Sequence, residues 1–258
     1  MPFFSATDGT RLHYETVGDG PAVVLQTGGA GDGSMWGDGG YVEPLSTAYQ
    51  CVLFDHRGHG QSDQPRRREA HSMERYVDDI VDLLDHLGVD RAGFWGYSQG
   101  GIIGLALAAL HPERLTALIM TGAMETPDRA LNAAENIEGA EALRTHGWQP
   151  SGYRSEPEER MPAWFHRQFD STNPEMVALW LDCAAEWDTW SHLSSVTVPV
   201  QMFVGDLEDP EHLNDRAAEQ MRYAGVRRLK GLDHLDAFIR SDLVVPEAMA
   251  FLARVSGY

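Results

Sequence analysis

The chain has 258 residues, of which 43% are hydrophobic and 9% aromatic, so it is long and apolar enough to bury a substantial core. Its 39 acidic and 20 basic side chains give a net charge of −19, which disfavours binding to nucleic acids, anionic membrane surfaces and strongly anionic substrates. Neither a secretory signal nor the roughly 18 consecutive apolar residues of a membrane span is evident, and the two cysteines have no metal-ligand spacing, so we expect a cytoplasmic protein without a metal or other cofactor.

Short apolar runs alternate with amphipathic stretches along most of the chain. The expected strands are residues 11–17, 22–27, 51–54, 92–96, 115–121 and 200–205, and the expected helices are 71–87 and 99–111. The runs at 22–27 and 51–54 are continuously apolar, which is typical of parallel strands buried on both faces. Ser72 is the expected N-cap of the first helix, and Gly88 is its stop. This alternation predicts the α/β class, with a mostly parallel central sheet flanked by helices.

One segment, residues 125–198, breaks the alternation. It has no strand-like run, and it holds five of the seven tryptophans, which are Trp148, Trp164, Trp180, Trp187 and Trp190. We expect a helical cap or lid here, over a core formed by residues 1–124 and 199–258. Trp164 and Trp187 are expected to line a substrate pocket, although the aromatic residues could instead form only the segment's own core.

The same segment is the most densely acidic part of the chain. It carries 13 acidic and 5 basic side chains in 74 residues. If it covers the site, it should repel polyanions and coenzyme A thioesters, and favour neutral or cationic substrates.

The residues Gly96-Tyr97-Ser98-Gln99-Gly100 form a G-x-S-x-G motif between an expected strand and an expected helix. A tight turn at this place would hold Ser98 in a strained conformation with its hydroxyl exposed above a helix N-terminus. The flanking glycines would remove Cβ atoms that clash there. Ser98 is the expected nucleophile, and Tyr97 is expected to face the pocket. The alternative is an ordinary strand–turn–helix joint.

A serine hydroxyl needs a base, which a carboxylate must hold in place. His234 follows a glycine turn late in the chain and is the candidate base. The candidate acids follow the apolar run at 200–205 and are Asp206, Glu208 and Asp209. The resulting order is serine, acid, histidine.

With these motifs, the chain resembles the α/β-hydrolase fold superfamily along essentially its whole length. Residues 55–62, Asp-His-Arg-Gly-His-Gly-Gln-Ser, resemble the family's D-x-R-G-x-G-x-S loop, so His56 and His59 are expected to be structural. Residues 27–31 match the oxyanion loop, with Thr27 where the family commonly has histidine. The resemblance implies that the backbone N–H groups of Gly29 and Gln99 bind the oxyanion, with Ala30 as the alternative to Gly29.

The family resemblance gives two answers for the acid. Its acid commonly sits three residues after the glycine that ends the strand, which selects Glu208. It is also often followed by proline, which selects Asp209, before Pro210. We prefer Asp209 and keep Glu208 as the alternative.

A serine at the elbow separates this chain from haloalkane dehalogenases and epoxide hydrolases of the same fold, which use aspartate there. The resemblance implies a cofactor-independent serine hydrolase, esterase- or lactonase-like, that cleaves a small, fairly apolar, neutral ester through an acyl-enzyme. Two alternatives stay open: a ligand receptor or regulatory protein on this fold, and a non-hydrolytic biosynthetic enzyme such as a cyclase or lyase. The expected partner is a small-molecule substrate, and the expected state is a monomer or homodimer.

Overall fold

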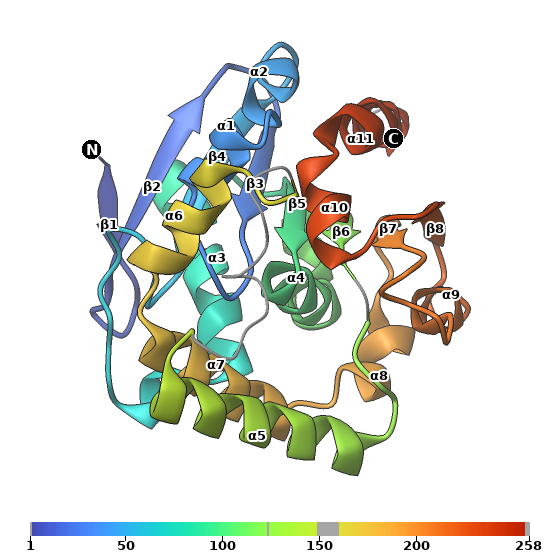
Figure 1. Cartoon of the computed structure of the whole chain (residues 1–258). Coiled ribbons are helices and arrows are strands. Elements are labelled where there is room, and N and C mark those ends of the chain that lie inside the picture. The colour runs from blue at the N-terminus through green and yellow to red at the C-terminus, as the bar shows by residue number, and fades with distance from the viewer. Residues whose placement is uncertain (1, 123, 149–159, 256–258) are drawn as a thin grey trace.

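The computed structural model describes residues 2–122, 124–148 and 160–255. Among these residues, eight strands form one sheet in the order β1-β2-β4-β3-β5-β6-β7-β8 (Figure 1). The strands are β1 Phe3–Ser5, β2 Arg11–Val17, β3 Ala22–Gln26, β4 Gln50–Asp55, β5 Ala92–Tyr97, β6 Leu115–Thr121, β7 Val200–Gly205 and β8 Ala224–Leu229. Strand β2 pairs antiparallel with both of its neighbours, β1 and β4. The six strands from β3 to β8 all run parallel to one another. The predicted α/β class is confirmed, and every expected strand is present.

Helices cover both faces of the sheet. Those outside the segment between β6 and β7 are α1 Ser34–Asp38, α2 Val42–Leu45, α3 Met73–Leu87, α4 Gln99–Leu110, α9 Leu213–Ala218, α10 His234–Ile239 and α11 Ser241–Val255, with 3₁₀ turns at Arg68–Ala70 and Pro112–Arg114. The predicted ends of α3 are confirmed, because Ser72 accepts a hydrogen bond from the Arg75 N–H and Gly88 is left-handed at φ 66°.

The strand residues divide the core in two, since successive side chains point to opposite faces. Val24 and Phe94 pack into the core that contains the buried residues of α3 and α4. Their neighbours Val23 and Trp95 pack into the second core, which contains those of α1, α2, α10 and α11. The central strands are therefore buried on both faces, which explains why their sequences are apolar without alternation.

The segment between β6 and β7 is helical where it is described. It contains α5 Arg129–His146, α6 Ala163–Ser171, α7 Pro174–Glu186 and α8 Thr189–His192, with a 3₁₀ turn at Leu193–Ser195. In Figure 1, α5 runs along α7 at the edge of the molecule, whereas α6 lies beside α1. We call residues 125–198 the helical insertion. Residues 149–159 lie outside the described residues, and the division into core and lid stays a prediction.

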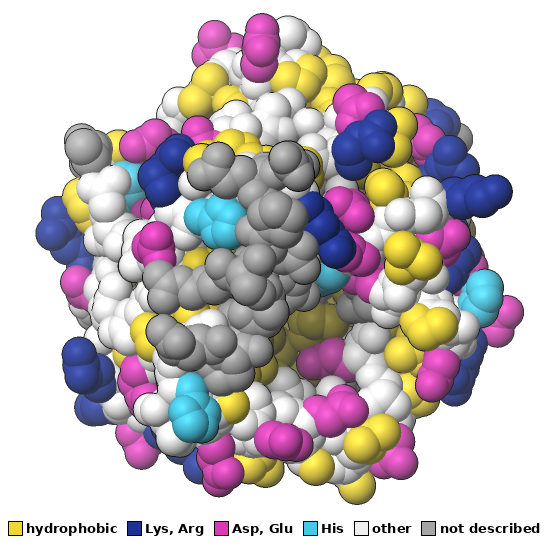
Figure 2. All heavy atoms as spheres, in the orientation of Figure 1, with side chains coloured by type: hydrophobic (Ala, Val, Ile, Leu, Met, Phe, Trp, Pro, Cys, Tyr) yellow, Lys and Arg dark blue, Asp and Glu magenta, His cyan; other side chains and the backbone are white. Residues whose placement is uncertain are grey.

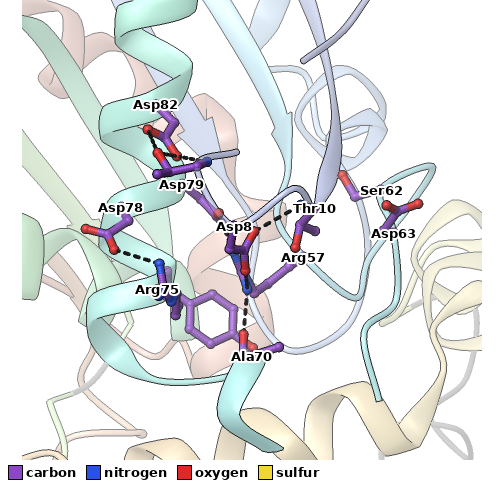
Figure 3. A network of polar contacts seen from close by, with 12 residues as sticks. Asp8, Thr10, Arg57, Ser62, Asp63, Ala70, Arg75, Asp78, Asp79 and Asp82 are labelled. Carbon is purple, nitrogen blue, oxygen red and sulfur yellow. Dashed lines mark hydrogen bonds and ion pairs between the residues drawn. The ribbon is translucent and has the colours of Figure 1, made fainter. Parts of the chain in front are cut away.

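The loop after β4 is structural. Arg57 is 1% exposed and donates from Nε and Nη2 to the two carboxylate oxygens of Asp79, at 2.7 and 2.6 Å. Its Nη1 reaches Asp8 and the carbonyl of Ala70, as Figure 3 shows. This buried guanidinium ties three segments together, so the loop has the structural role that the sequence predicts.

None of the helices in the described part of the chain is long and apolar enough to span a membrane.

Candidate active site

Ser98 occupies a sharp turn between β5 and α4. Its backbone angles are φ 54° and ψ −120°, a region that non-glycine residues rarely adopt. A Cβ atom at Gly96 would lie 2.1 Å from the Gly100 oxygen, and one at Gly100 would lie 2.4 Å from the Gln26 oxygen. Both positions therefore require glycine. The steric requirement for glycine at both positions is confirmed, and the backbone angles of Ser98 favour a nucleophile elbow over an ordinary strand–turn–helix joint.

His234 is the first residue of α10 and is held from two sides. Its Nδ1–H donates to Glu208 Oε2 at 2.6 Å, and the other Glu208 oxygen accepts from the Gly205 N–H at 2.9 Å. The Tyr97 ring stacks on the imidazole with centroids 5.0 Å apart, and the Tyr97 hydroxyl donates to the His234 carbonyl at 3.2 Å. A proton fixed at Nδ1 leaves Nε2 of the neutral ring as an acceptor.

The carboxylate beside His234 is Glu208, the alternative acid, so the preference for Asp209 is wrong. Asp209 is 1% exposed and accepts hydrogen bonds from the Leu213 N–H at 2.6 Å and from Arg228 Nη1 at 2.8 Å. It therefore anchors the start of α9. Asp206 accepts from the Gly231 N–H at 2.6 Å and so braces the turn before His234. The spacing from the strand-ending glycine was the better signal, and the following proline was misleading.

Ser98 and His234 line one cavity of about 260 Å³. They flank Gly122: a Cβ atom there would lie 3.1 Å from His234 Cε1 and 3.5 Å from Ser98 Cα. Among the described residues, the other lining residues are Gly28, Gly29, Ala30, Tyr97, Trp148, Phe165, Phe169, Val177 and Leu235. The walls are thus mostly apolar. Near the centre of the view, Figure 2 shows a hollow with hydrophobic side chains inside and acidic ones along its lower edge.

The pocket predictions are partly right. Tyr97 lines the cavity. Trp164 instead packs on Phe165 and Phe238, with ring centroids 5.2 and 6.5 Å away, and Trp187 packs edge-on against His192. Sequence reasoning missed Trp148, Phe165 and Phe169, three aromatic residues of the helical insertion. The spacing of the two phenylalanines, four residues apart on one helix face, was the available signal.

The expected oxyanion donors lie beside the serine. A Cβ atom at Gly28 would approach the Ser98 Cβ to 2.8 Å, and one at Gly29 would approach Gln99 Oε1 to 3.4 Å. The loop therefore packs directly on the elbow. Gln99 is the first residue of α4, where the N–H has no partner within the helix and the helix dipole favours negative charge.

Two buried histidines lie behind this loop. The rings of His56 and His59 stack with centroids 3.8 Å apart, and burial lowers the pKa of both. His59 Nε2–H donates to the Gly29 carbonyl at 3.0 Å. Both side chains are buried in the core and hydrogen-bond to neighbouring groups, His59 to the Gly29 carbonyl and His56 to the Gln99 amide, which agrees with the structural role expected for them.

Comparison of the sequence with known proteins finds hydrolases. A family model described as alpha/beta hydrolase fold matches residues 21–156, just over half of the chain. A curated relative, "Putative carbamate hydrolase RutD" of Caulobacter sp. (strain K31), is 38% identical over 120 residues, which are 45% of this chain and 44% of that protein. Proline iminopeptidase of Xylella fastidiosa (strain 9a5c) is 32% identical over 207 residues, 79% of this chain and 64% of that protein. The chain thus covers under half of the first relative and under two thirds of the second.

Solved structures agree over nearly the full length. A thermophilic esterase from Thermogutta terrifontis has a TM-score of 0.83 at 24% identity, with 99% of each chain covered. The enol-lactonase from Burkholderia xenovorans LB400 has a TM-score of 0.80 at 25% identity, covering 98% of this chain and 100% of that one. These likenesses establish the fold, and the family model establishes the family. The chain belongs to the α/β-hydrolase fold family of enzymes.

Proposed function

We propose that this protein is a serine hydrolase that cleaves small, uncharged, apolar esters or lactones through an acyl-enzyme intermediate. One observation carries the proposal: Ser98, in strained elbow geometry, shares a cavity with His234, whose Nδ1–H donates to Glu208. Esterases and a lactonase among the structural neighbours, and a carbamate hydrolase among the relatives by name, support a hydrolase on this fold.

In the proposed mechanism, Ser98 Oγ attacks the substrate carbonyl carbon while His234 Nε2 accepts its proton. Glu208 holds the imidazole in the required tautomer and stabilises the imidazolium that forms. The N–H groups of Gly29 and Gln99 bind the oxyanion of the tetrahedral intermediate. His234 then protonates the leaving alcohol and activates the water that hydrolyses the acyl-enzyme.

The cavity supports a small apolar acyl group. Its volume of about 260 Å³ lies just below the range of roughly 300–1,000 Å³ that is common for ligand pockets. Among its described lining residues no Asp, Glu, Lys or Arg occurs, so a charged acyl group would lose its hydration without gaining a partner. For the acyl group, this favours a neutral substrate over the cationic one that the sequence expectation also allowed.

The test is turnover of p-nitrophenyl esters and simple lactones of increasing chain length, by the native protein and by Ser98→Ala. We expect the native protein to prefer acyl chains of about two to six carbons, and Ser98→Ala to be inactive yet folded. Ser191→Ala is the matched control, because the exposed Ser191 hydroxyl bonds to residues of its own turn, the Asp188 carbonyl at 2.9 Å and His192 Nδ1 at 3.4 Å.

Two outcomes would contradict the proposal. Unchanged turnover in Ser98→Ala would exclude the serine as nucleophile. Single-turnover cleavage with ligand-induced stabilisation would favour the receptor alternative, since an enzyme must release its product and cycle.

A further inference from the structure

The oxyanion loop, residues 27–31, and the two residues that follow it contain four glycines, so this stretch has few side chains of its own with which to hold its shape. Thr27, which stands where related enzymes commonly have histidine, donates to the Gly31 carbonyl only at 3.4 Å. Gly31 adopts φ +102°, one of the many backbone conformations that glycine allows, so its own residue type does not fix the loop. Other parts of the molecule must therefore hold the loop in place.

Two consecutive N–H groups of the loop are bound by side chains of the helical insertion. The Gly31 N–H donates to Thr172 Oγ1 at 2.8 Å, and the Asp32 N–H donates to Gln168 Oε1 at 3.0 Å. Thr172 and Gln168 are 8% and 5% exposed, so water does not readily replace these contacts. They are four residues apart, one within α6 and one just after it, on one side of the chain.

Each of these side chains is itself fixed. The Thr172 hydroxyl donates its proton to the Gln168 carbonyl at 2.7 Å, which turns a lone pair toward Gly31. Gln168 Nε2 donates to Ser34 Oγ at 3.0 Å, so its amide has only one orientation that satisfies both ends. The loop therefore meets acceptors that are already oriented.

The same helix supplies the wall of the cavity. Phe165 and Phe169 line it from the neighbouring face of α6, and Trp148 Nε1 donates to the Thr172 carbonyl at 3.1 Å. Part of the acyl-binding wall and the support of the oxyanion loop thus belong to one helix and the residue after it. On the core side, His59 holds the loop through the Gly29 carbonyl.

We infer that Gln168 and Thr172 are positioning residues for the oxyanion hole, so that the hole is formed only while α6 is docked on the loop. This inference rests on the proposed function of the site. Without the two acceptors, the Gly31 and Asp32 N–H groups lose their partners and the loop relaxes, which moves the Gly29 N–H away from the developing charge. Since an error of about 1 Å in catalytic geometry can cost about 100-fold, the expected loss lies mainly in kcat.

The experiment compares Thr172→Val, which keeps the shape but removes the acceptor, with Thr172→Ser, which keeps the acceptor. We expect kcat on a short p-nitrophenyl ester to fall about 10- to 100-fold in Thr172→Val, with KM changed less than about 3-fold, since binding of the acyl group is untouched. The inhibition constant of a trifluoromethyl ketone, which mimics the tetrahedral intermediate, should rise in parallel. Thr172→Ser should recover most of the loss.

The matched control is Ser171→Ala. Ser171 lies on the same turn and donates to the same Gln168 carbonyl, at 3.1 Å, whereas the Gly31 N–H of the loop is bound by the Thr172 hydroxyl. This variant should behave as the native protein. The inference is overturned if Ser171→Ala and Thr172→Val lose activity equally. It is also overturned if Thr172→Val keeps full kcat while Ser98→Ala is inactive. In both cases the proposed function stands.

Amide hydrogen exchange gives a readout that does not depend on turnover. In Thr172→Val the amides of residues 29–32 should exchange at least about 10-fold faster than in Thr172→Ser, while those of β5 stay unchanged. Equal exchange in the two variants would overturn the inference even if the protein cleaves none of the esters. Turnover by Ser98→Ala would instead overturn the proposed function, and with it the role of this loop as an oxyanion hole, whatever the exchange rates of the two Thr172 variants.

Discussion

The assignment of the acid gives a prediction in which two neighbouring carboxylates should lose different properties. Glu208→Gln keeps the size of the side chain and removes its charge. The Gly205 N–H, which donates at 2.9 Å, will hold the amide oxygen, so the amide NH₂ faces His234 Nδ1. The imidazole must then accept at Nδ1 and carry its proton on Nε2, where it cannot take the proton of Ser98.

The expected loss in kcat is about 10³- to 10⁴-fold, or about 4–5.5 kcal/mol of activation free energy. The bond at stake is a charge-assisted one of 2.6 Å between His234 and a carboxylate that is 7% exposed. Because the bond from Gly205 survives, the free energy of unfolding should change by less than about 1 kcal/mol.

Asp209→Asn should show the opposite pattern. Its carboxylate is fully buried and pairs with Arg228, which is 23% exposed and keeps Asp215 as a second partner at 2.8 Å. The loss of the charge should therefore cost about 2 kcal/mol of stability, less than the 3–5 kcal/mol of a fully buried pair. For a chain of this size that lowers the melting temperature by about 4–8 °C, while kcat per folded molecule stays within about 3-fold of the native value.

Steady-state kinetics on a p-nitrophenyl ester, normalised by active-site titration, and thermal melts followed by circular dichroism test both variants together. The reasoning is refuted if Asp209→Asn loses more than about 10³-fold in kcat at an unchanged melting temperature while Glu208→Gln stays active. That result would mean that the acid changes partner during the reaction.

Further predictions concern the strained serine, the buried acid, the cavity wall and the charge. Ser98→Gly should raise the unfolding free energy above that of Ser98→Ala by about 1–3 kcal/mol, measured by denaturation, since glycine relieves the φ of 54°. Burial raises the pKa of Glu125 to about 7. Between about pH 4.5 and 7 the carboxyl is ionised in the unfolded chain but still protonated in the native one, so the free energy of unfolding should fall as the pH rises through this range. Thermal melts of Glu125→Gln should match those of the native protein near pH 4, and at pH 8 the variant should be about 3 kcal/mol more stable. Equal melting curves at pH 8 would contradict this. Phe169→Ala should shift the ester preference toward longer acyl chains and cost about 3 kcal/mol of stability. The acidic insertion should make acyl-coenzyme A a poor substrate at low salt, and rapid hydrolysis there would argue against a charge filter.

The fold and the strained turn at Ser98, the proposed nucleophile, could be predicted from the sequence because their causes are local. The elbow needs glycine at positions 96 and 100, because backbone atoms four or five residues away, or at the end of the adjoining strand, occupy the space of a Cβ. The continuous apolar runs of β3 and β4 likewise have a local cause, because each strand is buried on both faces of the sheet. His234 could be predicted as the candidate base because it follows a glycine turn late in the chain.

Only the tertiary structure decides which of several residues with the same chemistry comes into contact with a given partner. Glu208 and Asp209 are adjacent carboxylates, and only the packing of α9 and Arg228 sends the second away from His234. The cavity wall and the acceptors for the oxyanion loop come from α6, more than 130 residues after the loop that they contact. Sequence spacing carries no information about such encounters, because they depend on how the helical insertion packs against the sheet as a whole.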